Sequence, residues 1–222
     1  MTIPVQDIVT RVCDLLLDTD RSNDNSVRWG DAELIRWIND SRMALLTRRP
    51  NSCSKISNFT LVDGTQQAIP SDGVELIDIV RNMGMDGATV GKSIRRTDRQ
   101  NIDDSDMNWH AGTPSASISQ FTFDDRLVKT FFVYPPAIAG TQILGVYAAI
   151  PAQVSALTDT LGIDLENMDA VVNYVCYRAK SKDSEYANAA EAAAFYGAFN
   201  DAIGVNMQTQ AANTPNKAGN SV

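Results

Sequence analysis

The sequence predicts an α+β fold, with a helical bundle base built from both ends of the chain and a β-rich insert between them. Three patterns indicate this fold. Apolar residues recur with helical spacing in residues 1–54 and 151–204, and they alternate with polar residues through much of 55–150. Residues 205–222 contain almost no apolar mass, so we expect them to form an extended C-terminal arm.

Two amphipathic helices are expected in the N-terminal part of the base. Residues 4–17 place apolar side chains on one face with a period of 3.6. A second helix is expected over 31–48, with Asp31 as its N-cap and Pro50 as its end. We expect the two helices to form an αα-hairpin whose packing residues include Trp29, Leu34, Trp37 and Ile38.

The hydrophobic period changes to that of strands after Pro50. Asp63-Gly64 predicts a turn that joins its flanking strands in a β-hairpin, and Val74–Val80 predicts a strand buried on both faces. Residues 98–116 are polar and irregular, so we expect a loop there. Further strands are expected at 92–97, 118–123, 130–134 and 142–150, with Pro135-Pro136 ending the third of them.

Two more helices are expected after Pro151. The first spans 165–181, and the second spans about 184–203, is rich in alanine and ends at Gly204. Small side chains let helices approach closely, either within the bundle or between neighbouring copies. Ala190 and Ala194 are therefore candidate residues for a contact between subunits.

The charge and composition argue against several classes of protein. A net charge of −8 does not suit a non-specific nucleic-acid binder, which needs cations to displace counterions, but it does not exclude a protein that surrounds DNA and must avoid sticking to it. We expect no secretory signal, and no apolar run approaches the roughly 18 residues of a membrane span. Cys13, Cys53 and Cys176 are odd in number and widely spaced, which predicts reduced thiols.

No pattern in the chain predicts a catalytic, cofactor or metal site. The only histidine is His110, and a catalytic triad needs a histidine that a carboxylate orients. The acidic run from Asp104 resembles an EF-hand loop, but Trp109 stands where that loop requires glycine. A solvated acidic loop is the simpler interpretation of residues 103–110. We therefore expect no catalytic residue, no cofactor and no bound metal.

A succession of short stretches carries a resemblance to a known family. No one stretch is specific, but their order and spacing extend over about residues 5–205. The stretches are Arg28–Asp40 leading to Arg49-Pro50, Leu61–Pro70, Ile94–Arg99, Trp109-His110, Phe131–Pro136 and Tyr177–Ala187. In these features the chain resembles the head-to-tail adaptor proteins of tailed bacteriophages, which are also called connector or head-completion proteins.

The resemblance implies a structural role without catalytic residues. Such adaptors form a ring, commonly dodecameric, that sits beneath the portal, extends the DNA channel and gives the tail a docking platform. The expected partners are the portal protein, a tail or nozzle protein and neighbouring copies of the chain, while DNA passes without sequence-specific binding and no membrane is involved. The expected location is the virion neck, between capsid and tail, after synthesis in the host cytoplasm.

Two other functions are kept as alternatives. The β-rich insert suits a binding module of a tail or surface protein. The acidic loop at 103–110 suits, less well, a metal-assisted enzyme.

The C-terminal arm is expected to contact the portal or a neighbouring subunit, with an arm that lies on its own subunit as the alternative. Side-chain amides pair well with exposed backbone groups, and proline favours an extended path. The candidate contact residues are Asn206, Gln208, Gln210, Asn213, Pro215 and Asn216.

Overall fold

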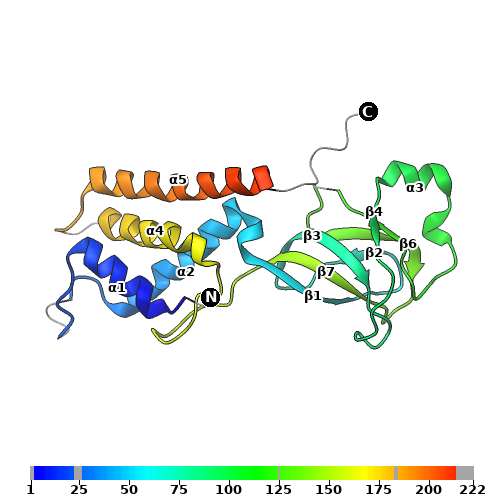
Figure 1. Ribbon diagram of the computed structural model, residues 1–222, viewed down its shortest axis with the longest axis horizontal. Coiled ribbons are helices and arrows are strands. Elements are labelled where there is room, and N and C mark those ends of the chain that lie inside the picture. Colours follow the sequence, from blue (N-terminus) through cyan, green and yellow to red (C-terminus); the bar gives the residue numbers. More distant parts are fainter. Residues whose placement is uncertain (1–2, 23–26, 125, 183–184, 214–222) are drawn as a thin grey trace. The chain divides into compact units, whose positions relative to one another are not determined.

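The computed structural model describes residues 3–22, 27–124, 126–182 and 185–213, and it confirms the α+β class (Figure 1). The chain folds into two compact units. One contains the described residues of 1–52 and 151–222, and the other contains residues 53–150. Each unit has its own apolar core, so each is described by itself.

Four α-helices form the first unit: α1 (Val5–Leu16), α2 (Asp31–Arg48), α4 (Met168–Ser181) and α5 (Ala189–Asn213). Helix α4 is central, because α1, α2 and α5 all pack against it (Figure 1). It can contact three helices because its apolar residues face more than one side. Its buried side chains are Met168, Ala170, Val171, Val172, Val175, Cys176 and Ala179.

This arrangement differs from the expected αα-hairpin. Helices α1 and α2 touch each other much less than each touches α4. Trp29, Leu34, Trp37 and Ile38 are all buried, but α4, which comes 120 residues later in the chain, supplies much of the apolar surface around α2. An amphipathic stripe predicts that a face is covered and does not predict which element covers it.

The start of α2 also differs from the prediction. Gly30 is the N-cap and offers no side-chain hydrogen bond, while Asp31 is the first residue inside the helix. The Asp31 carboxylate instead accepts a hydrogen bond from the Arg21 guanidinium. An acidic residue in the first turn still stabilises the helix through its dipole.

The expected extended arm is wrong for residues 205–213, because α5 continues through Gly204 to Asn213. Glycine inside a helix costs only about 1 kcal/mol relative to alanine, and adding residues to an existing helix is far easier than starting one. The following residues also include alanine, glutamine and methionine, which favour helices. Residues 214–222 lie outside the described part of the chain.

Two sheets that share one core form the second unit. The first has the order β1 (Ser54–Thr60), β7 (Gln142–Ala149), β3 (Gly73–Asn82), and all its pairs are antiparallel. The second has the order β2 (Gly64–Ala68), β6 (Thr130–Ala137), β5 (Gln120–Thr122), β4 (Arg95–Arg96), and only β4 and β5 are parallel. The shared core includes Phe59, Leu76, Ile79, Phe121, Phe131, Val133, Ile143 and Tyr147.

The predicted hairpin around Asp63-Gly64 does not form. Strand β1 pairs with β7, and β2 pairs with β6 in the other sheet. The connecting residues find partners far along the chain, since the Leu61 N–H donates to the Thr141 carbonyl and Asp63 accepts from the Ala139 N–H. The turn therefore carries the chain from one sheet to the other.

Three further expectations for this unit are corrected. Strand β3 is buried on one face only, since Asp78 and Val80 are exposed. The strand expected at 92–97 shortens to Arg95–Arg96, and the polar stretch at 98–116 contains helix α3 (Arg99–Ser105) and a 3-10 turn (Trp109–Ala111). Strand β6 continues through both prolines, because the Tyr134 and Pro136 carbonyls still accept from Ser119 and Ser115.

Candidate functional site

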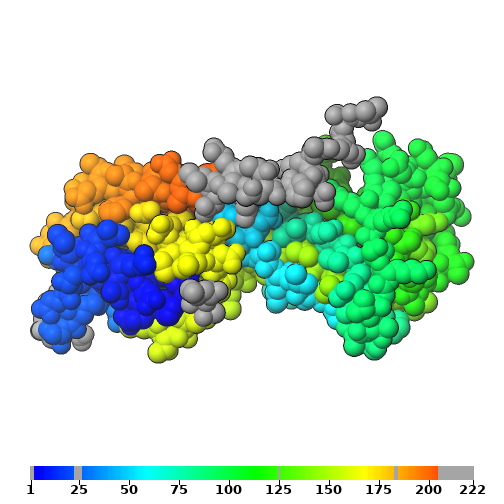
Figure 2. Space-filling model, viewed as in Figure 1, coloured from blue at the N-terminus to red at the C-terminus, as the bar shows by residue number. Residues whose placement is uncertain are grey.

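The outward face of α5 near its start carries small apolar side chains. Ala189, Ala190, Ala193 and Ala194 are exposed, whereas Phe199 and Ile203 are buried against α2 and α4. The first turns of α5, in orange, lie at the surface in Figure 2. Four small side chains thus present a smooth helix surface that no described residue covers.

A seam of aromatic rings fixes which face of α5 points outward. Tyr174 of α4 packs on Phe199 of α5 with ring centroids 5.2 Å apart, and Tyr177 packs on Tyr196 at 4.8 Å. Arg48 at the end of α2 stacks over the Phe199 ring at 4.9 Å and donates a 2.6 Å hydrogen bond to the Tyr196 hydroxyl. Such ring pairs add about 0.5–1.5 kcal/mol each to the burial of their area.

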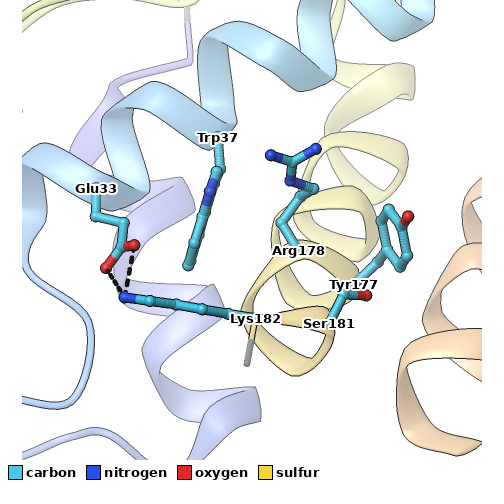
Figure 3. Close-up of a pocket in the computed structure, with 6 residues that line it drawn as sticks. All are labelled: Glu33, Trp37, Tyr177, Arg178, Ser181 and Lys182. Atoms are coloured by element: carbon cyan, nitrogen blue, oxygen red, sulfur yellow. Dashed lines mark hydrogen bonds and ion pairs between the residues drawn. The ribbon is translucent and has the colours of Figure 1, made fainter. Parts of the chain in front are cut away.

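A groove of about 360 Å³ lies between α2 and α4 and is lined by Glu33, Trp37, Tyr177, Arg178, Ser181 and Lys182. The Trp37 indole extends from α2 toward the Lys182 side chain, which reaches across to Glu33 (Figure 3). The two Lys182 Nζ to Glu33 carboxylate distances are 2.8 and 3.0 Å. Aromatic residues and arginine, here Trp37, Tyr177 and Arg178, are enriched in protein contact surfaces.

A buried carboxylate anchors the loop before α2. Asp18 is 3% exposed and accepts hydrogen bonds from the backbone N–H groups of Arg28 and Trp29 at 3.1 and 3.3 Å. The Arg21 guanidinium bridges Asp18 to Asp31 and also donates to the Trp29 carbonyl at 3.0 Å. Trp29 in turn packs on the Tyr186 ring at a centroid distance of 5.7 Å.

The acidic stretch 103–110 is folded by its own hydrogen bonds. Asp103 accepts from the Trp109 indole N–H at 2.8 Å, and Asp106 accepts from the Asn108 N–H at 3.0 Å. His110 stacks on Trp109, and its Nδ1 lies 2.8 Å from the Thr65 hydroxyl. Within the described ranges, no three histidine, cysteine or acidic side chains gather closely enough to hold a metal ion.

The three cysteines are buried. Burial raises the pKa of the Cys176 thiol to about 12, and the nearby Cys13 adds to the effect. Burial also raises the pKa of Cys13, although the Arg21 guanidinium opposes the shift. Both thiols therefore stay protonated near neutral pH, and a protonated thiol is a poor nucleophile. Among the described helices, none is long and apolar enough to span a membrane.

Comparison with known proteins places the chain in a family. Residues 3–219 match the family described as SU10 adaptor protein, which covers nearly the whole chain. The chain belongs to the SU10 adaptor family. This membership confirms the resemblance seen in the sequence, and the chain is a bacteriophage adaptor and a structural component of the virion. A comparison with curated proteins found no match.

The structure separates the candidate residues of this adaptor into three groups. Ala190 and Ala194 lie exposed on α5, and Trp29, Leu34, Trp37 and Ile38 are buried around α2. Asn206, Gln208, Gln210 and Asn213 belong to the helical end of α5, whereas Pro215 and Asn216 fall outside the described residues. Of the described candidates, Trp37 lines the groove between α2 and α4.

Sequence reasoning missed three features of the adaptor. The aromatic seam had a visible signal, because Tyr174, Tyr177, Tyr196 and Phe199 recur at intervals of three on two helices. The Asp18 contacts had no such signal, since they join a loop residue to backbone groups ten and eleven positions away. A groove on the second unit, lined by Lys92, Arg95 and Gln120 among others, also had no such signal, because its two walls lie more than 20 positions apart in the sequence.

Proposed function

We propose that this adaptor forms a dodecameric ring beneath the phage portal, extends the DNA channel and provides the docking platform for the tail. An adaptor of this family interacts with portal and tail proteins in general, which supports this placement. One structural observation carries the assembly part of the proposal: α5 leaves its alanine face exposed while its aromatic face is buried. Neighbouring copies would pack laterally through that face.

A structural role without catalysis forms part of the proposal. The carboxylates at 103 and 106 are engaged in local hydrogen bonds, which supports a packing role for the acidic stretch. The groove at Trp37 is lined by an ion pair and aromatic rings, and these groups suit contact with a partner protein.

The mass of the purified protein, alone and mixed with portal, tests the ring. We expect the full chain with portal to give a complex that contains twelve adaptor copies for each portal ring, measured by native mass spectrometry. A monomer that never joins portal at any concentration would refute the ring, and a different copy number would refute the dodecamer alone.

The C-terminal segment is proposed to dock on the portal or a neighbouring copy. Deleting residues 205–222 should leave the helical unit folded, because Phe199 and Ile203 remain to bury α5. We expect an almost unchanged melting temperature by circular dichroism and a strong loss of binding in a portal pull-down. A second deletion of 214–222 separates the helical end of α5 from the residues that follow.

The two deletions together decide the role of this segment. If the shorter deletion already abolishes docking, the contact lies beyond Asn213, and if only the longer one does, the end of α5 carries it. A protein lacking 205–222 that still caps portal would show the segment to be dispensable.

A further inference from the structure

The second unit contains a groove of about 530 Å³ at the edge of its four-stranded sheet. Its walls come from two segments, residues 92–95 beside β4 and residues 117–120 at the start of β5. The lining residues are Lys92, Ser93, Arg95, Ser117, Ile118, Ser119 and Gln120, and none of them is acidic. Such a surface is unusual in a chain whose net charge is −8.

The cations of this groove have no carboxylate partner among the described residues. Other cations of the same unit are paired, since Lys55 contacts Asp72 and Arg99 contacts Asp103. Arg96, the neighbour of Arg95, is directed elsewhere, because its guanidinium lies 4.3 Å over the Phe123 ring. Lys92 and Arg95 are exposed and leave their charged groups available in the groove.

A buried asparagine holds the two walls in place. Asn82 is 4% exposed, and its side-chain nitrogen donates to the carbonyls of Lys92 and Ile118 at 2.9 and 2.8 Å. Its side-chain oxygen accepts from the Ile118 N–H at 2.8 Å. The groove is therefore a rigid feature of the fold, since both walls are tied to the same core residue.

The polar groups around the groove can all donate hydrogen bonds. The Ser93 and Ser117 hydroxyls and the Gln120 amide have no side-chain hydrogen bonds within the described part of the unit, and they add to the two cations. The hydroxyls and the amide can also accept, but the two cations can only donate. An anionic ligand therefore suits this set best.

We propose that this groove binds the phosphodiester backbone of double-stranded DNA. A DNA backbone presents a regular row of charged phosphate oxygens, which can satisfy both cations at once. Arginine and lysine are the usual partners of phosphate, and serine hydroxyls commonly assist them. The acidic remainder of the chain limits the contact to this groove, so binding is weak and independent of sequence.

This inference rests on the proposed position of the adaptor around DNA, but its test does not require a ring. Fluorescence anisotropy of a short mixed-sequence duplex would be measured with the full chain at several salt concentrations. The test variant is Lys92→Gln with Arg95→Gln. The matched control is Arg126→Gln with Lys129→Gln, which removes the same charge from exposed positions of the same unit.

We expect the wild-type chain to bind the duplex at low salt, and the control to bind nearly as well. The groove variant should bind more weakly, and the slope of log affinity against log salt should shrink by about 2, close to one for each lost phosphate contact. Ser93→Asp, which places a carboxylate in the groove without removing a cation, should weaken binding as well. Circular dichroism checks that each variant remains folded.

Three results would overturn the proposal. One is the absence of DNA binding by the wild-type chain at low salt. Another is an equal loss of DNA affinity in the groove variant and in its control, which would show that overall charge causes the effect. The third is a groove variant that binds DNA normally but no longer assembles, which would assign the groove to an acidic segment of a protein. The mass of the particles is measured on the same samples. A failure to form the ring can then be distinguished from a failure to bind DNA.

Discussion

At the scale of single residues, Asp18 shows how one buried carboxylate organises the start of a helix. It satisfies two backbone N–H groups and pairs with Arg21, which also contacts Asp31 and the Trp29 carbonyl. Hydrogen bonds to a charged group are worth more than neutral ones, and buried donors left unpaired are costly. The loop before α2 therefore depends on this side chain.

Asp18→Ala should lower the free energy of unfolding by about 2–3 kcal/mol, because the N–H groups of Arg28 and Trp29 lose their acceptor. Chemical denaturation followed by tryptophan fluorescence measures the change. Asp14→Ala is the matched control, since Asp14 is exposed on α1 and should change stability by no more than about 0.5 kcal/mol. Equal effects in the two variants would show that the Asp18 contacts contribute little.

At the scale of elements, α5 combines a buried aromatic face with an exposed alanine face. The ring contacts with Tyr174 and Tyr177 orient the helix, and the Arg48 side chain donates a hydrogen bond to the Tyr196 hydroxyl of α5. A helix held in this way can present small residues to a neighbouring copy without moving. The element is thus stabilised on one side and available for assembly on the other.

Ala194→Glu should block ring assembly and leave the monomer folded, because a charged side chain would be buried without a partner in a close helix contact. Gln6→Glu adds the same charge to an exposed position on α1, outside the alanine face of α5, and should assemble normally. Size-exclusion chromatography with light scattering distinguishes the two. Normal rings from Ala194→Glu would refute the assignment of this face to the subunit contact.

At the scale of the whole molecule, two cores are built from separate stretches of one chain. Residues 53–150 bury Phe121, Phe131 and Tyr147 between two sheets, while the helical unit buries α4 among its neighbours. Each core makes its own contribution to stability, so the two units need not unfold together.

Phe131→Ala should destabilise the β unit by about 3–5 kcal/mol, because Phe131 is fully buried in its core. We expect hydrogen exchange to accelerate in β2, β5 and β6 while α1 and α4 keep their protection. Val175→Ala, at a fully buried position of α4, serves as the reciprocal variant in the helical unit. Faster exchange across both units in either variant would mean that the chain unfolds as one cooperative body.

The four helices of the first unit and the fold class could be predicted from the sequence because their signals are local, whereas the short helix α3 was not predicted. A stripe such as Met168, Val171 and Val175 repeats with the period of the helix itself, so the boundaries of α4 were predicted within three residues. The ordered succession of family stretches likewise indicated a phage adaptor, and the family match confirmed it.

The sites were less predictable, since they depend on residues brought together from distant positions. The Lys92–Gln120 groove needs Asn82 to join two segments, and the Trp37 groove needs α4 to cover α2. In both grooves the lining residues come from distant segments of the chain, so no regular spacing in the sequence indicates that they meet.

The sequence by itself determined where helices and strands begin to form, because hydrophobic periodicity acts over a few residues. Only the tertiary structure decided their partners. The turn at Asp63-Gly64 suits a hairpin, yet β1 and β2 join different sheets, since pairing with β7 and β6 buries Phe59 and Phe131 in one core. Gly204 suits a helix stop, yet α5 continues past it. Local preferences of about 1 kcal/mol yield to packing energies several times larger, and those energies exist only once the chain has folded.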